Sequence, residues 1–468
     1  MGQSNKPHDS SYGHSFVQFE MSLTSATPLE AAESAKAASH HLAALSNDAR
    51  NEALSSIHSH LQLYRDDILA ANARDMEAAR DAAANGQLSS SLVSRLDLAK
   101  PGKFDDMLKG IMDVVSLNDP LGVVSLRTKL DEGLVLERLS CPIGVLLIIF
   151  EARPEVIANI AALAIKSGNS AILKGGKEST HSFVAISEAI TKGLEKTSVP
   201  NGAIQLVTTR DVIPQLLQLD RYIDLVIPRG GNELVRYVKE NTKIPVLGHA
   251  DGLCSIYLEG SADAAMATNV IFDSKTNYPA ACNSLETLLV EESALETVWP
   301  AAAHALVAKD VELRCDAKTK ASLLAKLPLV ADHVKDAQDV DFDTEHLALV
   351  LAVKTVSGLD EAIAHINTHG SHHTDAILTS DKDNAEKFMT AIDSAGVYWN
   401  ASTRMADGMR YGFGTEVGIS TNKIHARGPV GLEGLTIYKY KVRGTGQVSS
   451  AYGEGTNQKS FLHQSMPL

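Results

Sequence analysis

Cys282 is the residue whose type and surroundings best suit covalent chemistry. It lies in the segment 277–287 (NYPAACNSLET), where small and polar neighbours leave a thiol accessible. A nucleophilic cysteine needs exposure and nearby positive or dipolar groups, whereas most cysteines act as small packed hydrophobes. Cys141, Cys254 and Cys315 adjoin apolar runs or charges and are predicted to be packed residues. From composition alone, Cys282 could also be an inert packed residue. The patterns described below favour a nucleophile.

Two glycine-containing turns follow predicted strands and open predicted helices. Backbone amides at a helix N-terminus, together with lysine side chains, favour phosphate. Neither G-x-G-x-x-G nor G-x-x-x-x-G-K-[ST] occurs, so the standard nucleotide fingerprints are absent. Each turn alone is explained by a tight connection, but two basic turns on one sheet edge favour a dinucleotide. The candidate cofactor residues in the turns are Lys174, Gly175, Gly176, Lys177, Glu178, Gly230 and Gly231.

Three arginines stand where a small anionic ligand could bind. Arg153 follows the most apolar predicted strand, Arg404 ends the polar loop that contains Asn400 and Ser402, and Arg427 lies in the segment HARGP. The planar guanidinium group suits carboxylates and phosphates. We expect these five residues to bind the substrate.

A dense histidine cluster lies at residues 365–375. It contains His365, His369, His372 and His373 with Asp375, which are residue types that bind metals. The segment is predicted to run from helix through turn to strand, which would scatter the side chains. We therefore expect structural polar contacts and no metal.

Bulk composition limits the classes of function. The chain has 468 residues, a net charge of −14 and only 4 cysteines, which argues against wrapping nucleic acid and against a disulfide scaffold. Residues 143–150, the longest apolar run, are too short to cross a bilayer. No secretory leader is recognisable. A reducing, cytoplasmic location without membrane contact is the simplest expectation.

The elements that must position these residues follow an α/β pattern. Thr27-Pro28-Leu29-Glu30 reads as a capping box that opens a helical region extending to Arg80. From residue 143 strands and helices alternate, which is typical of parallel sheets covered by helices. Such sheets bind ligands beyond the carboxyl ends of their strands. Predicted strands cover 143–150, 170–174, 204–207, 222–227 and 245–247, and predicted helices cover 154–167, 178–196, 212–219, 232–241 and 293–308.

The pattern predicts two parallel α/β domains and a small β subdomain. Strand-like segments at 121–140 and in the C-terminal region have no obvious partner in the parallel sheets, and unpaired strands favour pairing with another subunit. The expected division is a disordered tail (1–22), a dinucleotide-binding domain (23–120 and 141–253), a catalytic domain with Cys282 (254–424) and an oligomerisation β subdomain (121–140 and 432–450).

Together these features resemble the gamma-glutamyl phosphate reductase family of the aldehyde dehydrogenase superfamily, from about residue 25 to 445. Residues 281–290 (ACNSLETLLV) are similar to the nucleophile segment of that family. Residues 356–377 match its signature V-x5-A-[LIV]-x-H-I-x2-[HY]-[GS]-[ST]-x-H-[ST]-[DE]-x-I in full. Residues 400–404 and 425–429 also resemble family segments.

Two departures from the wider superfamily bear on mechanism. Hydrolytic members activate water with a Glu in an E-L-G-G-K segment, but residues 246–251 here read VLGHAD. They also use an Asn from P-W-N-x-P to stabilise the oxyanion, but residues 150–154 contain no Asn. The backbone amide of Cys282 and the side chain of Asn283 are the remaining candidates. A thioester here would meet phosphate or hydride and not water.

The resemblance implies NADPH-dependent reduction of L-glutamyl 5-phosphate to L-glutamate 5-semialdehyde with release of phosphate, the second step of proline biosynthesis. It implies that Cys282 forms a thioester, Lys174 contacts the adenosine ribose or its 2′-phosphate, and Glu345 contacts the nicotinamide ribose. It also implies a homo-oligomer, either a dimer or a dimer of dimers. A separate glutamate 5-kinase must supply the acyl phosphate and is a candidate for transient contact. The alternatives are an NAD(P)-dependent aldehyde-oxidising dehydrogenase and a catalytically silent dinucleotide-binding protein of the same fold.

Overall fold

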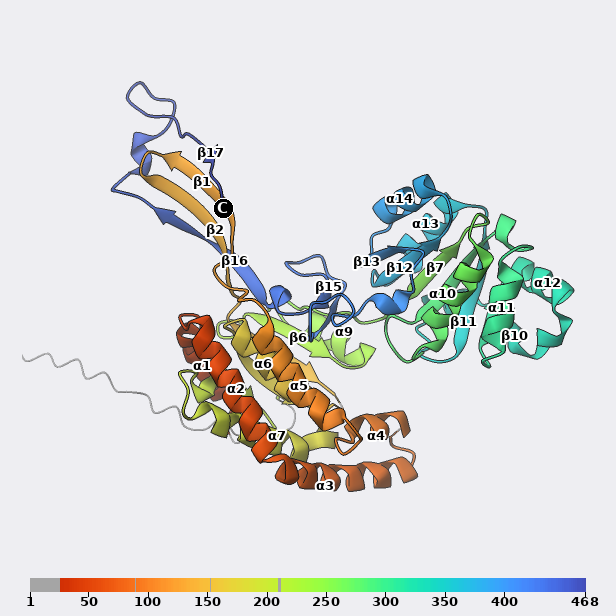
Figure 1. The fold of residues 1–468 in the computed structure, drawn as a ribbon, viewed down its shortest axis with the longest axis horizontal. Coiled ribbons are helices and arrows are strands. Elements are labelled where there is room, and N and C mark those ends of the chain that lie inside the picture. Colours follow the sequence, from red (N-terminus) through yellow and green to blue (C-terminus); the bar gives the residue numbers. More distant parts are fainter. Residues whose placement is uncertain (1–25, 89, 152, 209–211) are drawn as a thin grey trace, which may run out of the picture.

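The computed structural model describes residues 26–88, 90–151, 153–208 and 212–468. The segment 1–22, expected to be a tail, lies outside these residues. The described chain forms two helix-covered α/β units and a long antiparallel arm that projects away from the first unit (Figure 1). This is the α/β architecture that the sequence predicts, with parallel sheets and smaller antiparallel ones.

The first unit is built on a four-stranded parallel sheet of order β5-β4-β3-β6. All residues of β3 are buried, because helices cover both faces of the sheet. Leu146 and Ile148 pack with α2, α5, α6 and α7, whereas Leu147 and Ile149 pack on the opposite face with α1. The strands are β3 (Val145–Phe150), β4 (Ser170–Gly175), β5 (Ile204–Leu206) and β6 (Leu225–Arg229).

The helices of the first unit begin where the sequence places a capping box. The Thr27 side chain accepts from the Glu30 amide and the Glu30 side chain accepts from the Thr27 amide, so this prediction is confirmed. The helices are α1 (Pro28–Leu42), α2 (Asn47–Leu63), α3 (Arg65–Ala84), α4 (Ser90–Leu96), α5 (Lys103–Ser116), α6 (Val156–Lys166), α7 (Thr180–Leu194), α8 (Ile213–Leu216) and α9 (Asn232–Glu240).

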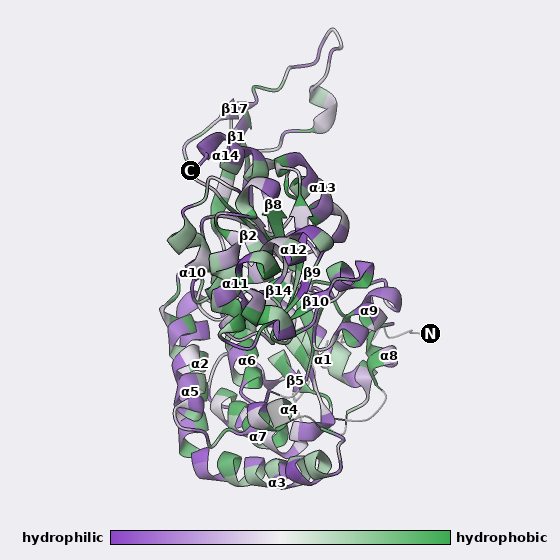
Figure 2. Ribbon diagram, turned by 90° about the vertical axis from the view of Figure 1, so that its right-hand side faces the viewer, coloured by the Kyte–Doolittle hydropathy of each residue, from purple (hydrophilic) through white to green (hydrophobic). Residues whose placement is uncertain are grey.

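The second unit carries a seven-stranded parallel sheet of order β10-β9-β11-β8-β7-β12-β13. Figure 2 shows hydrophobic residues on inner strands such as β8 and hydrophilic residues on outer helices such as α13. Its strands are β7 (Cys254–Leu258), β8 (Leu285–Glu291), β9 (Glu312–Cys315), β10 (Val334–Asp336), β11 (Val350–Val356), β12 (Thr374–Leu378) and β13 (Gly396–Trp399). Its helices are α10 (Ala264–Thr276), α11 (Trp299–Val307), α12 (Ala317–Lys326), α13 (Leu359–His369) and α14 (Lys382–Ala391).

After the second unit the chain returns to the first. The short strands β14 (Gly418–Ser420) and β15 (Gly428–Val430) pair with each other. Val417 and Val430 are buried in the core of the first unit. The second unit therefore ends before Val417, earlier than the expected boundary at 424, because the side chains of this segment find their apolar partners in the first unit.

The arm is a four-stranded antiparallel sheet of order β16-β2-β1-β17. β1 (Val124–Asp131) and β2 (Leu134–Pro142) form a hairpin, and β16 (Thr436–Arg443) and β17 (Gln464–Ser465) flank it. The outer strand β16 exposes apolar side chains at Ile437, Tyr438, Tyr440 and Val442.

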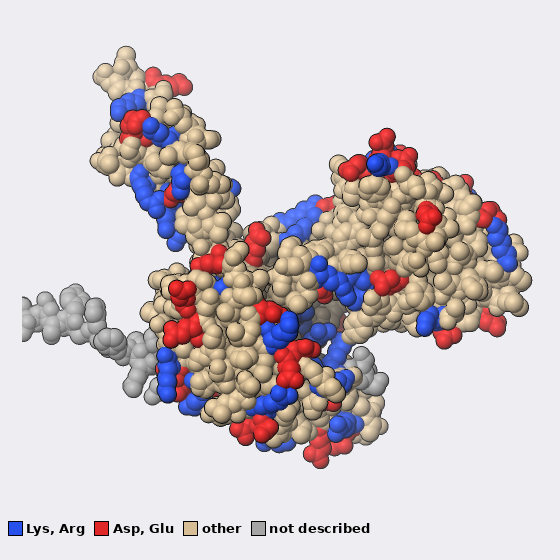
Figure 3. Space-filling view, in the orientation of Figure 1, with Lys and Arg blue, Asp and Glu red and all other residues tan. Residues whose placement is uncertain are grey.

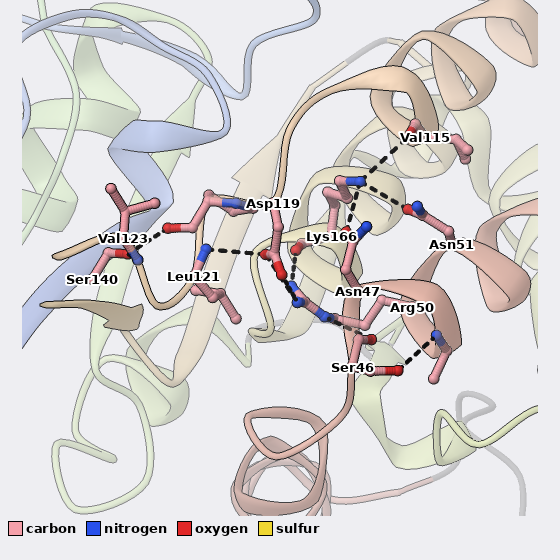
Figure 4. A network of polar contacts seen from close by, with 12 residues as sticks. Ser46, Asn47, Arg50, Asn51, Val115, Asp119, Leu121, Val123, Ser140 and Lys166 are labelled. Carbon is pink, nitrogen blue, oxygen red and sulfur yellow. Dashed lines mark hydrogen bonds and ion pairs between the residues drawn. The ribbon is translucent and has the colours of Figure 1, made fainter.

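A buried polar network ties the base of the arm to the first unit (Figure 4). Arg50 of α2 is buried and donates to Lys166 O and, at 2.8 Å, to a carboxylate oxygen of Asp119. Lys166 of α6 donates to Asn47 and Asn51 at 2.9 and 2.8 Å. The other oxygen of Asp119 accepts the backbone amide that leads into the arm, at 3.0 Å.

Some predicted elements differ from those observed. The helix expected at 293–308 begins at Trp299, after a short turn at Glu292–Ala294, because Pro300 fits only the first helical positions. The strand expected at 222–227 begins at Leu225, because the preceding residues continue a turn that bonds to Leu219 O. The strand expected at 245–247 is reduced to one bridge between Val226 and Val246.

Candidate active site

Cys282 lies in the loop between α10 and β8, and its side chain is partly exposed. The Cys254 thiol donates to Cys282 O at 3.4 Å. Gly252 packs directly on the loop, since a Cβ built there would lie 1.9 Å from Cys282 O and 2.6 Å from its Cα. The backbone of Gly252 therefore supports the Cys282 loop directly, and there is no room for a side chain between them.

Two imidazoles meet the Cys282 sulfur. Cys282, His249 and His373 each place one side-chain atom within 4.8 Å of the others', and the two rings lie edge to face with centroids 5.0 Å apart. His249 Nδ1 donates to Ile419 O at 3.0 Å, and His373 Nδ1 contacts Thr374 Oγ1 at 3.0 Å. Within the described residues, Nε2 of His373 is buried and has no hydrogen-bond partner. Each ring is thus held through Nδ1, and Nε2 of His373 takes no hydrogen bond from the described residues.

Positive charge surrounds the loop. The guanidinium groups of Arg229, at the end of β6, and of Arg404 both interact electrostatically with Cys282. Burial lowers the pKa of both arginines. Burial also lowers the pKa of His249, which favours a neutral ring able to accept a proton.

The side chain of Asn283 is turned away from an oxyanion role. Its Nδ2 donates to Ala406 O at 2.9 Å and its Oδ1 accepts from Arg404 Nη1. Arg404 is also held by Asn277 O at 2.6 Å from Nε. Asn283 therefore positions Arg404, and the backbone amide of Cys282 is the remaining oxyanion donor of the pair expected from sequence.

A cavity of about 210 Å³ lies where the two units meet. Arg153 and Arg229 line it from the first unit. Asp407 and Glu416 line it from the segment in which the chain returns from the second unit to the first. Burial raises the pKa of Glu416. Arg229 lines this cavity and also interacts electrostatically with Cys282, so the charge of one guanidinium group acts on both places.

Three other expected substrate residues are occupied by the protein itself. Both side-chain atoms of Asn400 bond to the backbone of Thr379, at 2.9 and 3.0 Å. Ser402 Oγ donates to Asp273 at 2.6 Å. Arg427 donates to Asp393 O at 3.0 Å and to its carboxylate at 3.2 Å. Asn400 and Ser402 thereby hold loops of the second unit, and Arg427 ties the returning segment of the chain to Asp393 of that unit.

The expected cofactor turns lie at the carboxyl ends of β4 and β6, on either side of β3. Lys174 Nζ donates to Gly175 O at 2.8 Å, and burial lowers the pKa of Lys174. A Cβ at Gly175 would lie 2.1 Å from the ring of Phe183, so this glycine is required by packing. Lys177 is exposed and Glu178 is partly exposed.

The turn before α9 already holds an anion. The Gly231 amide donates to Glu151 Oε2 at 3.1 Å, and the space beside Gly231 Cα is open to 4 Å. The carboxylate oxygen stands in for a phosphate oxygen at this helix N-terminus. The Gly231 amide is therefore able to bind an anionic oxygen, and the exposed Glu151 side chain occupies it here.

Glu345 lies near Gly252 and His249. Burial, followed by the nearby charge of Glu286, raises its pKa to about 7, and the Gly252 amide donates to it. Burial also raises the pKa of Glu286 to about 7, although Lys275 donates to it at 3.0 Å.

The histidine cluster is scattered, as the sequence indicated. His365 stacks on His369 with centroids 4.4 Å apart, His372 Nδ1 donates to Asp393 O at 2.7 Å, and only His373 reaches Cys282. Sequence reasoning missed His249 and Arg229. His249 lies in the segment 246–251, which was considered only for its missing Glu.

Comparison with known proteins places this geometry in a family. The aldehyde dehydrogenase family matches residues 13–326 and 308–425. A Schizosaccharomyces pombe protein described as a probable gamma-glutamyl phosphate reductase is 54% identical over 93% of this chain and 96% of its own. The gamma-glutamyl phosphate reductase of Saccharomyces cerevisiae is 49% identical over 93% of this chain and 97% of its own.

Solved structures agree. The gamma-glutamyl phosphate reductase of Thermotoga maritima superposes with a TM-score of 0.85 at 38% identity, covering 90% of this chain and all of that one. An acetylating aldehyde dehydrogenase from Geobacillus thermoglucosidasius shares the fold, with a TM-score of 0.61 at 18% identity over 90% of this chain and 97% of its own. The chain therefore belongs to the aldehyde dehydrogenase family and, within it, to the gamma-glutamyl phosphate reductases.

Proposed function

We propose that this protein reduces L-glutamyl 5-phosphate to L-glutamate 5-semialdehyde with NADPH and releases phosphate, in the second step of proline biosynthesis. The observation that carries the proposal is the Cys282 sulfur between His249 and His373, in a family whose hydrolytic members carry a Glu where this chain has none. The relatives named gamma-glutamyl phosphate reductase define the substrate class.

The first half-reaction is nucleophilic. The Cys282 sulfur attacks the acyl carbon, the carbon–oxygen bond to phosphate breaks, and phosphate leaves. The thiol proton passes to the free nitrogen of His249 or His373, whose opposite nitrogens are held by Ile419 O and Thr374 Oγ1. Covalent catalysis divides one difficult reduction into two easier steps.

The charges around the loop bind and polarise the substrate. Arg153 and Arg229 face the cavity between the units and suit the phosphate or the carboxylate of the substrate. The backbone amide of Cys282 donates to the developing oxyanion, which backbone donors stabilise without reorganisation.

The fold family implies a nicotinamide cofactor. When bound, it would supply a hydride to the thioester carbon; the carbon–sulfur bond then breaks, the semialdehyde leaves, and the Cys282 sulfur regains its proton from the imidazole. We propose that the first unit (23–120 and 141–253) holds it through Lys174, Lys177 and the turn before α9, while the second unit (254–424) holds the nucleophile. Two lysines beside the turns favour the 2′-phosphate and hence NADP over NAD. Glu345 is the proposed partner of the nicotinamide ribose. Its carboxyl group accepts from the amide of Gly252, which packs on the Cys282 loop.

The reverse reaction tests the proposal. NADPH formation from semialdehyde and NADP should depend strictly on phosphate, because residues 246–251 contain no Glu at the water-activating position and Asp251 is held by Arg236 at 2.9 Å. Rapid NADPH formation without phosphate would instead identify an aldehyde-oxidising dehydrogenase.

Cys282→Ala provides the matched variant. It should abolish turnover, on the order of 10³-fold or more, while cofactor binding and the unfolding temperature stay unchanged. Cys141→Ala is the control and should retain full activity. Alkylation distinguishes a silent dinucleotide-binding protein, in which Cys282 would be no more reactive than Cys315, whose pKa burial raises to about 12.

We propose a homo-oligomer that forms through the arm. The exposed apolar residues of β16 favour a second copy as the partner. Light scattering that detects an active monomer at micromolar concentration would contradict this. A cytoplasmic location and transient contact with a glutamate 5-kinase complete the proposal. No helix in the described part of the chain has the length and apolar character needed to cross a membrane, and Figure 3 shows acidic and basic side chains interspersed on the two units.

A further inference from the structure

The side chains around the nucleophile together form a set of metal-ligand atoms, and the proposed reaction does not use them together in that way. One thiol and two imidazoles converge, with their ligand atoms within 4.8 Å of one another. Around tetrahedral zinc, with bond lengths of about 2.0–2.3 Å, such atoms lie roughly 3.5 Å apart. The three groups therefore need to approach by at most about 1.3 Å, which small side-chain rotations supply.

The second shell of such a site is already present. His249 Nδ1–H donates to Ile419 O, and His373 Nδ1 is paired with Thr374 Oγ1. Metal-bound imidazoles typically donate their other nitrogen to a carbonyl or similar oxygen, which fixes the tautomer and the ring orientation. The His249 ring is thus preset to present Nε2 as an acceptor, and the His373 ring presents Nε2 in the tautomer whose Nδ1 donates to Thr374 Oγ1.

One donor is unpaired in the protein. His373 is 1% exposed, and its Nε2 has no hydrogen-bond partner among the described residues. An unpaired buried polar nitrogen is costly, and a cation between the rings and the sulfur would satisfy it. Cys282 and His249 are partly exposed, so the site is in contact with solvent, which can supply a water as fourth ligand.

We propose that Cys282, His249 and His373 bind one zinc-type thiophilic divalent cation, and that this binding reversibly inhibits the enzyme. The Cys282 thiol loses its proton to the buffer and its sulfur lone pair forms the metal bond. The sulfur is then unable to attack an acyl phosphate until a chelator removes the cation. The cation is an inhibitor and takes no part in the reduction.

Cobalt(II) titration of the reduced full-length protein in phosphate-free buffer tests the site. We expect saturation at one equivalent, a sulfur-to-cobalt charge-transfer band, and loss of the band on adding Zn²⁺. Cys282→Ser should lose the charge-transfer band. Cys254→Ser and Cys141→Ser should retain it, although the Cys254 sulfur lies 3.8 Å from His373 Nδ1.

Competition with a chromophoric chelator measures the role of the rings. His249→Ala and His373→Ala should each weaken Zn²⁺ binding by more than about tenfold, since loss of even an outer-shell partner weakens metal binding that much. His369→Ala, which removes an imidazole bonded to Asp343 and remote from the sulfur, should bind Zn²⁺ as the wild type does. Thermal unfolding confirms that each variant is folded, and the partly exposed His249 keeps the test informative if His373→Ala does not fold.

The readouts are independent of turnover, so the site can fail while the proposed reaction stands. A charge-transfer band that persists in Cys282→Ser, or wild-type affinity in the folded histidine variants, would overturn the proposal. Binding that involves Cys282 but neither ring would reduce it to ordinary thiol capture and would also overturn it. Activity supplies the last comparison: the inhibition constant for Zn²⁺ should equal its dissociation constant, and a chelator should restore activity fully.

Discussion

Replacing Gly252 by alanine should disable the enzyme while leaving it folded. The backbone of Gly252 lies outside the left-handed region, so alanine is not strained there by its own conformation. Its Cβ, however, would lie 1.9 Å from Cys282 O, whereas ordinary contacts begin at 3.4 Å. The nucleophile loop must therefore retreat by about 1.5 Å, because the clashing atoms are backbone and have no rotamer to change.

The size of the effect follows from that displacement. Misplacing a reacting group by about 1 Å costs roughly 10²-fold in rate, and overpacking a site costs about 1–3 kcal/mol of stability. We expect Gly252→Ala to lower kcat of the reverse reaction by roughly 10²-fold or more and to lower the unfolding temperature modestly. Stopped-flow absorbance of NADPH, with saturating semialdehyde, NADP and phosphate, measures kcat.

Gly248→Ala is the matched control, four residues away. Its Cβ would meet Pro228 O at 3.4 Å, an ordinary contact, and its kcat should stay within about twofold of the wild type because no displacement is needed. A folded Gly252→Ala enzyme with near-normal kcat would refute the view that Gly252 sets the position of the sulfur.

Three further perturbations have defined outcomes. Lys174→Ala should raise KM for NADPH more than for NADH. Equal effects on the two KM values in steady-state kinetics would indicate that Lys177, and not Lys174, contacts the 2′-phosphate. Arg50→Met should lower the free energy of unfolding by about 1–3 kcal/mol, because it leaves Lys166 O and the partly buried Asp119 carboxylate without their donor, whereas Arg65→Met, at an exposed pair, should cost at most about 1 kcal/mol in the same denaturation series. Burial raises the pKa of Glu345 from 4.5 to about 7, so between those pH values the native state binds a proton that the unfolded state does not, and stability falls as pH rises. The pH profile of the unfolding temperature for Glu345→Gln should lack this fall. Parallel profiles for the variant and the wild type would contradict this expectation.

The patterned parts of the fold were predictable from sequence. The capping box at Thr27 and Glu30 is local and uses the residue types that its hydrogen bonds require. The apolar run at 143–150 indicated a strand buried on both faces, and β3 is buried throughout. The return of the chain to the first unit at Val417 was not predictable, because short apolar segments do not specify which core they join.

The sequence singled out a candidate nucleophile but not the side chains that surround it. Cys282 could be identified because polar, small neighbours are unusual for a packed thiol. His249 and Arg229 were missed because their proximity to the sulfur depends on how the two units meet, which no local spacing encodes. Asn400, Ser402 and Arg427 remain predicted substrate residues, and the sequence did not indicate that each also donates to a neighbouring loop.

The division of the site between two bodies has a kinetic consequence. The sulfur belongs to the second unit and the cofactor turns belong to the first. The chain passes between the units through residues 248–253 and again before Val417. A change in the relative position of the two units would therefore change the distance between the sulfur and the proposed cofactor turns. Turnover should respond to solvent viscosity and to the stiffness of these two crossings, even where no crossing residue touches a reactant.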